Sequence, residues 1–231
     1  MMEEFSRLSP LRILERSSRK ELGRGNLGVL MARAGVGKTA CLIHIAFDKL
    51  FRRDKMVHVS LTDAPEKVAS YYNVILSDLI KALGLDSEDE IRAMIERHRM
   101  ILAYLNRSFD ISRLRRNLDN LEHHIGFKPD SIIVDGLDVA GVGRGILDGF
   151  KALAGELEME VWFSAVNHRH ITERNENGIP YPCNEVDDLF SIILQLQPGL
   201  NGMDLLLLKD HEIYGQPVAR INLDPSTFLG S

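Results

Sequence analysis

The sequence predicts an α/β fold with a mostly parallel, twisted sheet flanked by helices and with antiparallel strands toward the C-terminus. Three observations support this fold class. Short β-rich apolar runs alternate with longer amphipathic segments along most of the chain, a pattern typical of strands joined by helices. One of these runs leads directly into a glycine-containing loop and a helix. The last runs follow one another without a helical segment between them, which indicates antiparallel pairing.

The first 22 residues are predicted to form an N-terminal helical arm, and residues 23–231 the main domain. Four apolar residues spaced by three form a narrow stripe on the arm: Phe5, Leu8, Leu11 and Leu14. Such a stripe buries one face of a helix. Two interpretations remain open, because the helix either packs on its own domain or docks on a neighbouring subunit. Pro10 marks the start of the helix or a kink in it.

A phosphate-binding loop is the clearest motif in the chain. Residues 32–39 read A-R-A-G-V-G-K-T and fit the pattern G-x-x-x-x-G-K-[ST], with Ala32 in place of the first glycine. The apolar run 27–31 predicts the strand that leads in, and an amphipathic stretch from Lys38 to about Leu50 predicts the helix that leads out. A glycine turn that precedes Lys-Thr by chance is the alternative, but strand, loop and helix fall in register.

The residue types of this loop suit a nucleotide phosphate. Gly35 and Gly37 let the backbone approach a phosphate closely, and the N–H groups of the loop and of the helix N-terminus form an anion site. Lys38 is expected to reach the β- and γ-phosphates, and the Thr39 hydroxyl to hold Mg²⁺. The predicted contacts to the cofactor are Ala34, Gly35, Val36, Gly37, Lys38, Thr39 and Ala40.

A second strand is predicted over residues 56–61, with His58 packed inside it. Polar residues follow the end of this strand, and ligands of open parallel sheets bind at the carboxyl ends of the strands. Asp63 and Glu66 are therefore candidate site residues. The alternative for both is that they cap the helix that follows.

The middle of the chain predicts helices over residues 66–97, interrupted near Gly84, and a third strand over 100–105. Asp110 is the expected N-cap of a helix that runs to about His124. A local formal charge of +3 near this helix start comes from Asp110 and four arginines: Arg107, Arg113, Arg115 and Arg116. A solvated helix face is the default interpretation of these arginines, and contact with a nucleic-acid backbone is the alternative.

A β-branched apolar run ends in Asp135, which indicates a buried strand that delivers a carboxylate to a site. In proteins with a phosphate-binding loop, such a carboxylate lies beside the magnesium ion, so Asp135 and Thr39 are the predicted metal residues. Asp138 is a second candidate, with capping of the next helix as the alternative. Residues 139–149 are glycine-rich and predict a loop, followed by a helix that ends near residue 157.

Another strand is predicted over residues 161–166, and it ends at Asn167 and His168. These polar groups are expected at the same sheet edge as the phosphate loop, so His168 is a candidate site residue. Residues 167–188 form a long loop with two arginines and five acidic residues, a formal charge of −3. Loops of this length are usually functional or disordered.

The remaining strands are predicted over residues 188–196, 203–208 and 218–223. The first two are expected to form a hairpin across Pro198-Gly199-Leu200-Asn201-Gly202, because proline and glycine mark turns.

The composition is that of an ordinary globular protein, with 231 residues, 45% hydrophobic and 26% charged, and a formal net charge of −5. This charge disfavours nucleic acid and anionic membranes as partners. Apolar runs long enough to span a bilayer are absent, as is the apolar core of a secretion signal. Cys41 and Cys183 match no metal-ligand spacing, so they are expected to stay reduced in the cytoplasm.

Taken in chain order, the motifs resemble the ATPase core of RecA-like proteins, most closely the DnaB-type helicase and KaiC-like branches. The motifs that carry the resemblance are the phosphate loop, Val-Ser-Leu, Lys-Pro-Asp-Ser-Ile-Ile-Val-Asp, Phe-Ser-Ala-Val-Asn and Leu-Lys-Asp-His. The resemblance covers roughly residues 22–229. It implies a three-layer fold and ATP bound with magnesium between adjacent subunits of a homo-oligomeric ring or filament.

The chain departs from the family pattern at three places. The family has a Glu after Val-Ser-Leu, where this chain has Thr62 followed by Asp63. It has a Gln after the Ser of the sensor strand, where this chain has Ala165, so that Asn167 or His168 substitutes only from a shifted position.

The third departure concerns a Lys-x-Arg pair that reaches into the neighbour's site in the family. This chain has Lys209 and His211 at those positions. An arginine finger contributes about three to five orders of magnitude to turnover, and histidine is shorter and charged only part of the time at neutral pH. Nucleotide binding is therefore expected and fast hydrolysis is not.

Three functional hypotheses follow from these features. The first is a slow or partner-activated ATPase that acts as an oligomer, with Lys38 and Lys209 neutralising phosphate charge and Asp63 or Glu66 activating water. The second is a nucleotide-gated switch or scaffold with little hydrolysis. The third is a helicase-like or recombinase-like ATPase that binds nucleic acid, which the net charge of −5 and the acidic loop disfavour.

Overall fold

The computed structural model describes residues 5, 7–17, 21–104, 109–168, 170–200 and 202–230. Within these ranges, eight strands form one sheet in the order β3-β2-β4-β5-β1-β6-β7-β8. Leu105, Arg107 and Arg169, which belong to the predicted third strand, arginine cluster and long loop, lie outside the described residues, as does the side chain of Leu14.

The sheet is parallel from β3 through β6 and antiparallel beyond it. The strands are β1 (Leu27–Ala32), β2 (Met56–Ser60), β3 (Arg99–Ala103), β4 (Ser131–Asp135), β5 (Glu160–Val166), β6 (Phe190–Gly199), β7 (Gly202–Asp210) and β8 (Ile213–Leu223). The predicted fold class is therefore confirmed, including the antiparallel hairpin near the C-terminus. The last strand begins earlier than predicted, because its first residues pair with the end of β7.

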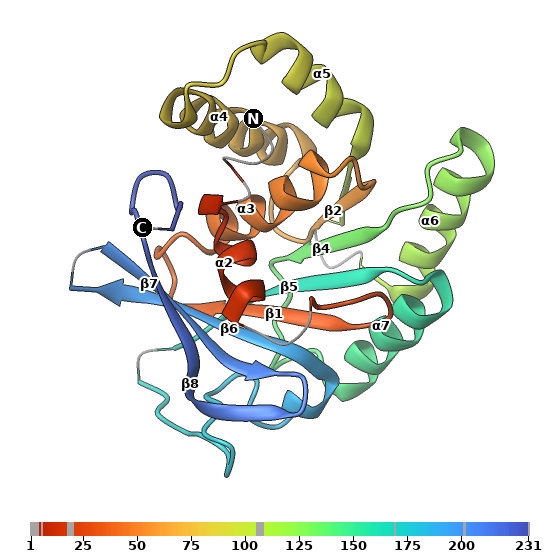
Figure 1. Ribbon diagram of the computed structural model, residues 1–231. Helices are drawn as coiled ribbons and strands as arrows, with labels where there is room; N and C mark the ends of the chain where they lie inside the picture. The colour runs from red at the N-terminus through yellow and green to blue at the C-terminus, as the bar shows by residue number, and fades with distance from the viewer. Residues whose placement is uncertain are drawn as a thin grey trace.

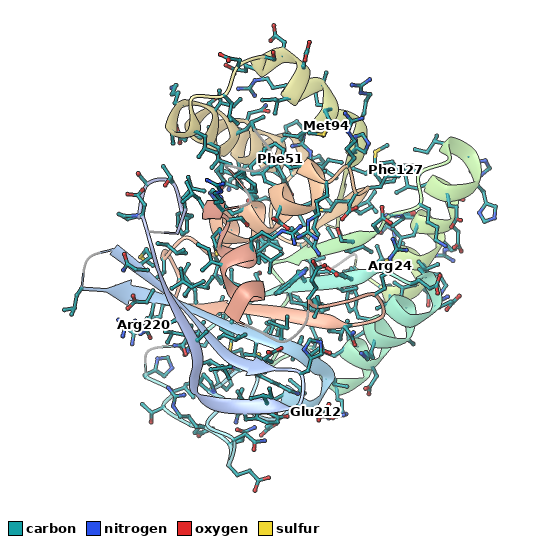
Figure 2. The ribbon with its side chains drawn as sticks, in the orientation of Figure 1. Arg24, Phe51, Met94, Phe127, Glu212 and Arg220 are labelled. Carbon is teal, nitrogen blue, oxygen red and sulfur yellow. The ribbon has the colours of Figure 1, made fainter. Side chains whose placement is uncertain are left out.

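Helices cover both faces of the sheet (Figure 1). They are α2 (Pro10–Ser17), α3 (Lys38–Phe51), α4 (Pro65–Leu83), α5 (Glu88–His98), α6 (Ile111–Ile125) and α7 (Arg144–Leu157), with a short 3₁₀ helix at Asp187–Leu189. One apolar cluster joins α3, α4 and α5 to the sheet, and another joins α6 and α7 to its other face. In the first cluster, Figure 2 labels Phe51 of α3 and Met94 of α5. Across the described ranges, no helix is both long and apolar enough to cross a membrane.

The N-terminal segment packs on its own chain. Phe5 and Leu11 are buried, and the ring centroids of Phe5 and Phe51 lie 4.8 Å apart in an edge-on contact. Helix α2 begins at Pro10, where the missing N–H of proline costs little. Of the two interpretations of this segment, the structure shows the one in which it packs on its own domain. The domain boundary after residue 22 stays a prediction.

Helix α7 begins earlier than predicted. A loop was expected through residue 149, but the helix starts at Arg144, directly after Gly143 with a φ of 74°. Gly149 lies inside α7, where an added Cβ would be 3.4 Å from the Ile111 side chain of α6. Packing of the two helices thus outweighs the weak helix propensity of glycine.

Asp110 caps α6 as predicted. Its carboxylate accepts hydrogen bonds from the backbone N–H groups of Ser112 at 2.6 Å and Arg113 at 3.2 Å. The bond from Ser112 is the main reason why the pKa of Asp110 is lowered.

Asp110→Ala is expected to lower the melting temperature by about 2–4 °C at neutral pH, because the first N–H groups of α6 lose their acceptor. The pKa of Asp110 is lowered in the folded state, so its contribution is present above the unfolded pKa and disappears as the pH falls through the folded value. The difference between wild type and variant should therefore shrink in acid. Thermal melts by circular dichroism measure this, and Asp110→Ser, which keeps a capping oxygen, should recover most of the loss.

Candidate functional site

The predicted phosphate loop joins β1 to α3 at the carboxyl edge of the sheet. Gly35 and Gly37 have φ values of 77° and 100°, in the region that favours glycine. Helix α3 has no side-chain cap at its N-terminus, and the first N–H groups of a helix lack partners within the helix. An added Cβ on Gly35 would meet nothing within 4 Å. The loop thus presents open backbone toward solvent, as an anion site requires.

Thr39, Asp135 and Ser164 form a hydrogen-bonded chain beside the loop. The Thr39 hydroxyl donates to one carboxylate oxygen of Asp135 at 2.8 Å, and the Ser164 hydroxyl donates to the other at 2.5 Å. Ser164 Oγ also accepts the Gly136 N–H at 3.0 Å. Asp135 is 8% exposed, and hydrogen bonds hold both of its carboxylate oxygens in place.

The sheet order explains this chain of contacts. Strand β5 lies between β1, which leads into the loop, and β4, which ends in Asp135. Phe163 on β5 pairs in register with Val134 on β4, so the residues that follow them, Ser164 and Asp135, lie side by side. Ser164 belongs to the Phe-Ser-Ala-Val-Asn motif, but no role was predicted for it. The available signal was a small polar residue inside an otherwise apolar strand.

A cavity of about 380 Å³ opens beside these residues. Its polar lining comes from Lys38, Thr39, Thr62, Asp135, Asp138, Ser164, His168 and Tyr181. Burial lowers the pKa of Lys38, and the nearby Asp135 carboxylate opposes that shift. A cavity of this size and polarity fits a small charged ligand, and Lys38 supplies a positive charge next to the open loop.

The structure brings His168 and Thr62 to this cavity, and it leaves Asp63 and Glu66 out of the lining. The Asp63 carboxylate instead accepts a hydrogen bond from the Lys67 ammonium at 2.6 Å, one turn along the chain. Glu66 is exposed in the first turn of α4. Neither residue is the N-cap, because Ala64 holds that position without a side-chain cap. Both candidates for activating water thus lie outside the cavity in this conformation.

Asp138 also lines the cavity, and one of its carboxylate oxygens accepts the Gly141 N–H at 3.2 Å. This bond closes a turn before α7, whose N-cap is Gly143. The alternative that Asp138 caps the helix is therefore wrong.

Lys209 and His211 lie at the opposite edge of the sheet from the phosphate loop. Strand β7 is antiparallel to β6, so its end returns to the start of β6, where Lys209 pairs with Ile193. Lys209 is 4% exposed, and its ammonium donates to the Asp187 carbonyl at 2.8 Å. Burial lowers the pKa of Lys209.

His211 occupies the turn between β7 and β8, with its Nδ1 2.8 Å from an Asp210 carboxylate oxygen. The structure therefore does not bring Lys209 or His211 to the cavity of their own chain. Lys209 would also have to leave its buried contacts before it could reach a neighbouring subunit.

The long loop after β5 contributes two residues for which no role was predicted. Tyr181 and Pro182 line the cavity, and the ring of Tyr181 lies 6.0 Å from that of His168. Asn175 shapes this loop, because its side-chain oxygen accepts the Asn177 and Ile179 N–H groups at 3.1 and 2.9 Å. Sequence gave no signal for these residues, because the loop path depends on such local contacts.

The predicted sensor position is occupied by a residue without polar atoms on its side chain. Ala165 is buried at 1% exposure, whereas Asn167 lines a second hollow of about 450 Å³ beside Arg33 of the phosphate loop. His168 borders both hollows. Of the two residues that could replace the family's glutamine from a shifted position, His168 lines the first cavity and Asn167 lines only the second hollow.

The donor chemistry of the site suits a hard cation. A threonine hydroxyl and a carboxylate are oxygen donors of the kind that Mg²⁺ prefers, and in phosphate sites Mg²⁺ takes one or two protein ligands and fills the rest with water and phosphate oxygens. In the described part of the chain, no group of three or more His, Cys, Asp or Glu side chains is arranged to hold a metal ion. Thr39 and Asp135 therefore fit an ion that arrives with a phosphate.

Two described arginines of the predicted cluster engage their own chain. The Arg113 guanidinium lies 5.6 Å from the centre of the Tyr104 ring, and Arg115 forms an ion pair with Glu156. These contacts give no specific support to a nucleic-acid surface, which stays a prediction.

A scan against protein-family models found no match to this chain, and a search of curated proteins found no similar one.

Proposed function

We propose that this chain binds a nucleoside triphosphate together with Mg²⁺ in the cavity beside the phosphate loop. The observation that carries the proposal is the Thr39–Asp135–Ser164 chain of hydrogen bonds next to Lys38 and the open loop. ATP is the default nucleotide, because the sequence contains no recognisable guanine-reading motif. The mostly parallel sheet and the order of motifs support a RecA-like protein. Assembly into a ring or filament is proposed from that resemblance alone.

Each part of the site has a distinct task in this proposal. The loop N–H groups and the N-terminus of α3 bind phosphate oxygens, and Lys38 neutralises their charge. Thr39 and Asp135 would hold a Mg²⁺ ion, which would neutralise part of the phosphate charge. Ser164 keeps the Asp135 carboxylate in place through its hydrogen bond at 2.5 Å.

Calorimetric titration with a non-hydrolysable ATP analogue tests this proposal directly. Binding should be saturable, with one nucleotide per chain, and should weaken when EDTA removes magnesium. The absence of binding heat in both conditions, with a protein shown to be folded by circular dichroism, would refute it. Titration with the matching GTP analogue then tests the choice of base.

Hydrolysis is proposed to be slow without a partner. The cavity lining lacks the carboxylates of Asp63 and Glu66, and Asp63 is held by Lys67. A general base contributes roughly 10²–10⁴-fold to a reaction rate. Without these carboxylates in the cavity, the site is expected to bind ATP but to hydrolyse it slowly.

The same observation favours a second candidate function, a nucleotide-gated switch or scaffold. ATP would order loops around the cavity and tighten contacts between subunits without being consumed. Size-exclusion chromatography and thermal melts, each with and without the magnesium complex of ATP, measure this. Unchanged oligomeric state and unchanged melting temperature would exclude it.

Thr62→Glu is expected to raise the rate of phosphate release by about tenfold, because it places a carboxylate at a position that lines the cavity. Thr62 is exposed, so the longer side chain has room to extend. A coupled assay of phosphate release measures the rate. Thr62→Gln is the matched control, with similar shape and no base, and should stay at the wild-type rate; equal rates for the Glu and Gln variants would contradict the prediction.

A further inference from the structure

A turn near the C-terminus packs directly against the phosphate loop. Figure 1 shows residues 224–230 beside the loop that leads into α3. The ring of Phe228 in this turn covers the α-carbon of Gly37, because an added Cβ on Gly37 would lie 2.5 Å from the ring edge. Phe228 is 9% exposed. Gly37 is thus half-buried, with an aromatic ring against its α-carbon.

The turn is built to hold this ring in place. One carboxylate oxygen of Asp224 accepts the backbone N–H groups of Ser226 at 2.9 Å and Thr227 at 2.8 Å, together with both of their hydroxyls. The Phe228 N–H donates to the Asp224 carbonyl at 2.8 Å, and the Gly230 N–H donates to the Leu8 carbonyl at 2.8 Å. The turn is therefore closed on itself and attached to the N-terminal segment.

The backbone of Phe228 is strained in this position. Its φ is 54°, which is uncommon for a bulky side chain. Such conformations persist where the surrounding contacts determine them, and they are frequent at ligand clamps. The left-handed conformation directs the ring of Phe228 toward Gly37, whose own φ is 100°.

We propose that Phe228 is a positioning residue of the phosphate loop. Its ring fills the space behind Gly37 and stabilises the left-handed conformation that directs the loop N–H groups outward. Without the ring, Gly37 is free to sample other backbone conformations, since glycine has no Cβ to restrict it. The consequence for nucleotide affinity rests on the proposed function; the consequence for the order of the loop does not.

The first measurement needs no nucleotide. Hydrogen–deuterium exchange of a peptide covering residues 33–40 should be faster in Phe228→Ala than in the wild type. Leu229→Ala is the matched control, because Leu229 is 7% exposed in the same turn and is not among the atoms closest to Gly37. Equal exchange in the wild type and Phe228→Ala, or equally fast exchange in both variants, overturns the proposal.

The second measurement is affinity for the magnesium complex of a non-hydrolysable ATP analogue, by calorimetry at a temperature where each variant is folded. Phe228→Ala should bind about tenfold more weakly, as expected when the backbone of about one residue must be ordered on binding. Phe228→Tyr should bind as the wild type does, because it keeps the ring. If the alanine variant fails to fold, Phe228→Leu replaces it, since it keeps apolar volume and loses the flat ring.

The outcomes separate this inference from the proposed function. Absence of analogue binding by the wild type refutes nucleotide binding, while the exchange measurement still decides the role of Phe228. Binding by the wild type with equal affinity in Phe228→Ala and Leu229→Ala supports the proposed function and overturns the positioning role. Weaker binding by Phe228→Ala, with Phe228→Tyr restored, supports both.

Discussion

Lys38→Ala is expected to weaken binding of the magnesium complex of ATP by about 100-fold, because charged hydrogen bonds contribute roughly 1.5–3 kcal/mol each. Among the described residues that line the cavity, Lys38 is the one Lys or Arg side chain. Asp135 and Asp138 line the same cavity. Removal of the ammonium would leave the phosphates beside two carboxylates with no positive side chain of the cavity lining to offset them.

Calorimetric titration of the variant with the ATP analogue measures this loss. Lys128→Ala is the matched control, because Lys128 is exposed in the segment before β4, at the opposite edge of the sheet. The control should bind as the wild type does. If the two variants bind equally well, the cavity is not the nucleotide site and the proposed function fails.

Asp135→Asn is expected to remove the magnesium dependence of binding. Asp135 accepts hydrogen bonds from Thr39 and Ser164, and the asparagine amide keeps the size of the side chain while it loses the charge and one acceptor. Affinity in magnesium should fall about 100-fold, toward the value measured in EDTA, by the same size of charge-assisted contact.

The matched control for this variant is Asp138→Asn. Asp138 lines the same cavity but is exposed, and its carboxylate closes the turn to Gly141. Titrations of both variants with manganese in place of magnesium give an independent readout, because binding of the paramagnetic ion reduces the electron spin resonance signal of the free ion. Loss of ion binding in Asp138→Asn and its retention in Asp135→Asn would reverse the assignment.

The sequence predicted the parts of the site that are encoded locally. The loop of residues 32–39 is fixed by two glycines, whose positive φ values of 77° and 100° are the ones the motif requires. The strand before Asp135 is buried throughout, so its apolar run was sufficient to place the carboxylate at the strand end. The helix that starts after Asp110 was likewise predicted from a cap whose hydrogen bonds span three residues.

The parts that sequence did not predict depend on contacts between distant segments. Ser164 forms a hydrogen bond with Asp135 because β5 lies between β1 and β4. No single segment of the sequence encodes this order of strands. Gly149 packs inside α7 against Ile111 of α6. The long loop is a different case, because contacts within the loop itself, such as those of Asn175, accompany the path that brings Tyr181 to the cavity.

Asp63 illustrates a different limit. Its place after β2 was predicted, but its partner was not, because the Lys67 ammonium competes for the same carboxylate from one turn away. Lys209 was expected to act on phosphate, and its burial against the Asp187 carbonyl follows from the antiparallel return of β7. For both residues, the sequence predicted the position along the chain but not the direction of the side chain.

The helix that carries Lys38 and Thr39 is held at both of its ends. Phe228 covers Gly37 at its start. Near its other end, the buried Lys49 ammonium forms an ion pair with Glu160 at 2.7 Å, and Asp48 pairs with Arg12 of α2. Movement of α3 along its axis would break these contacts together, so the helix is a fixed reference within the molecule. We therefore expect any conformational change on ligand binding to occur in the loops that surround the cavity. A partner that responds to the ligand should contact those loops.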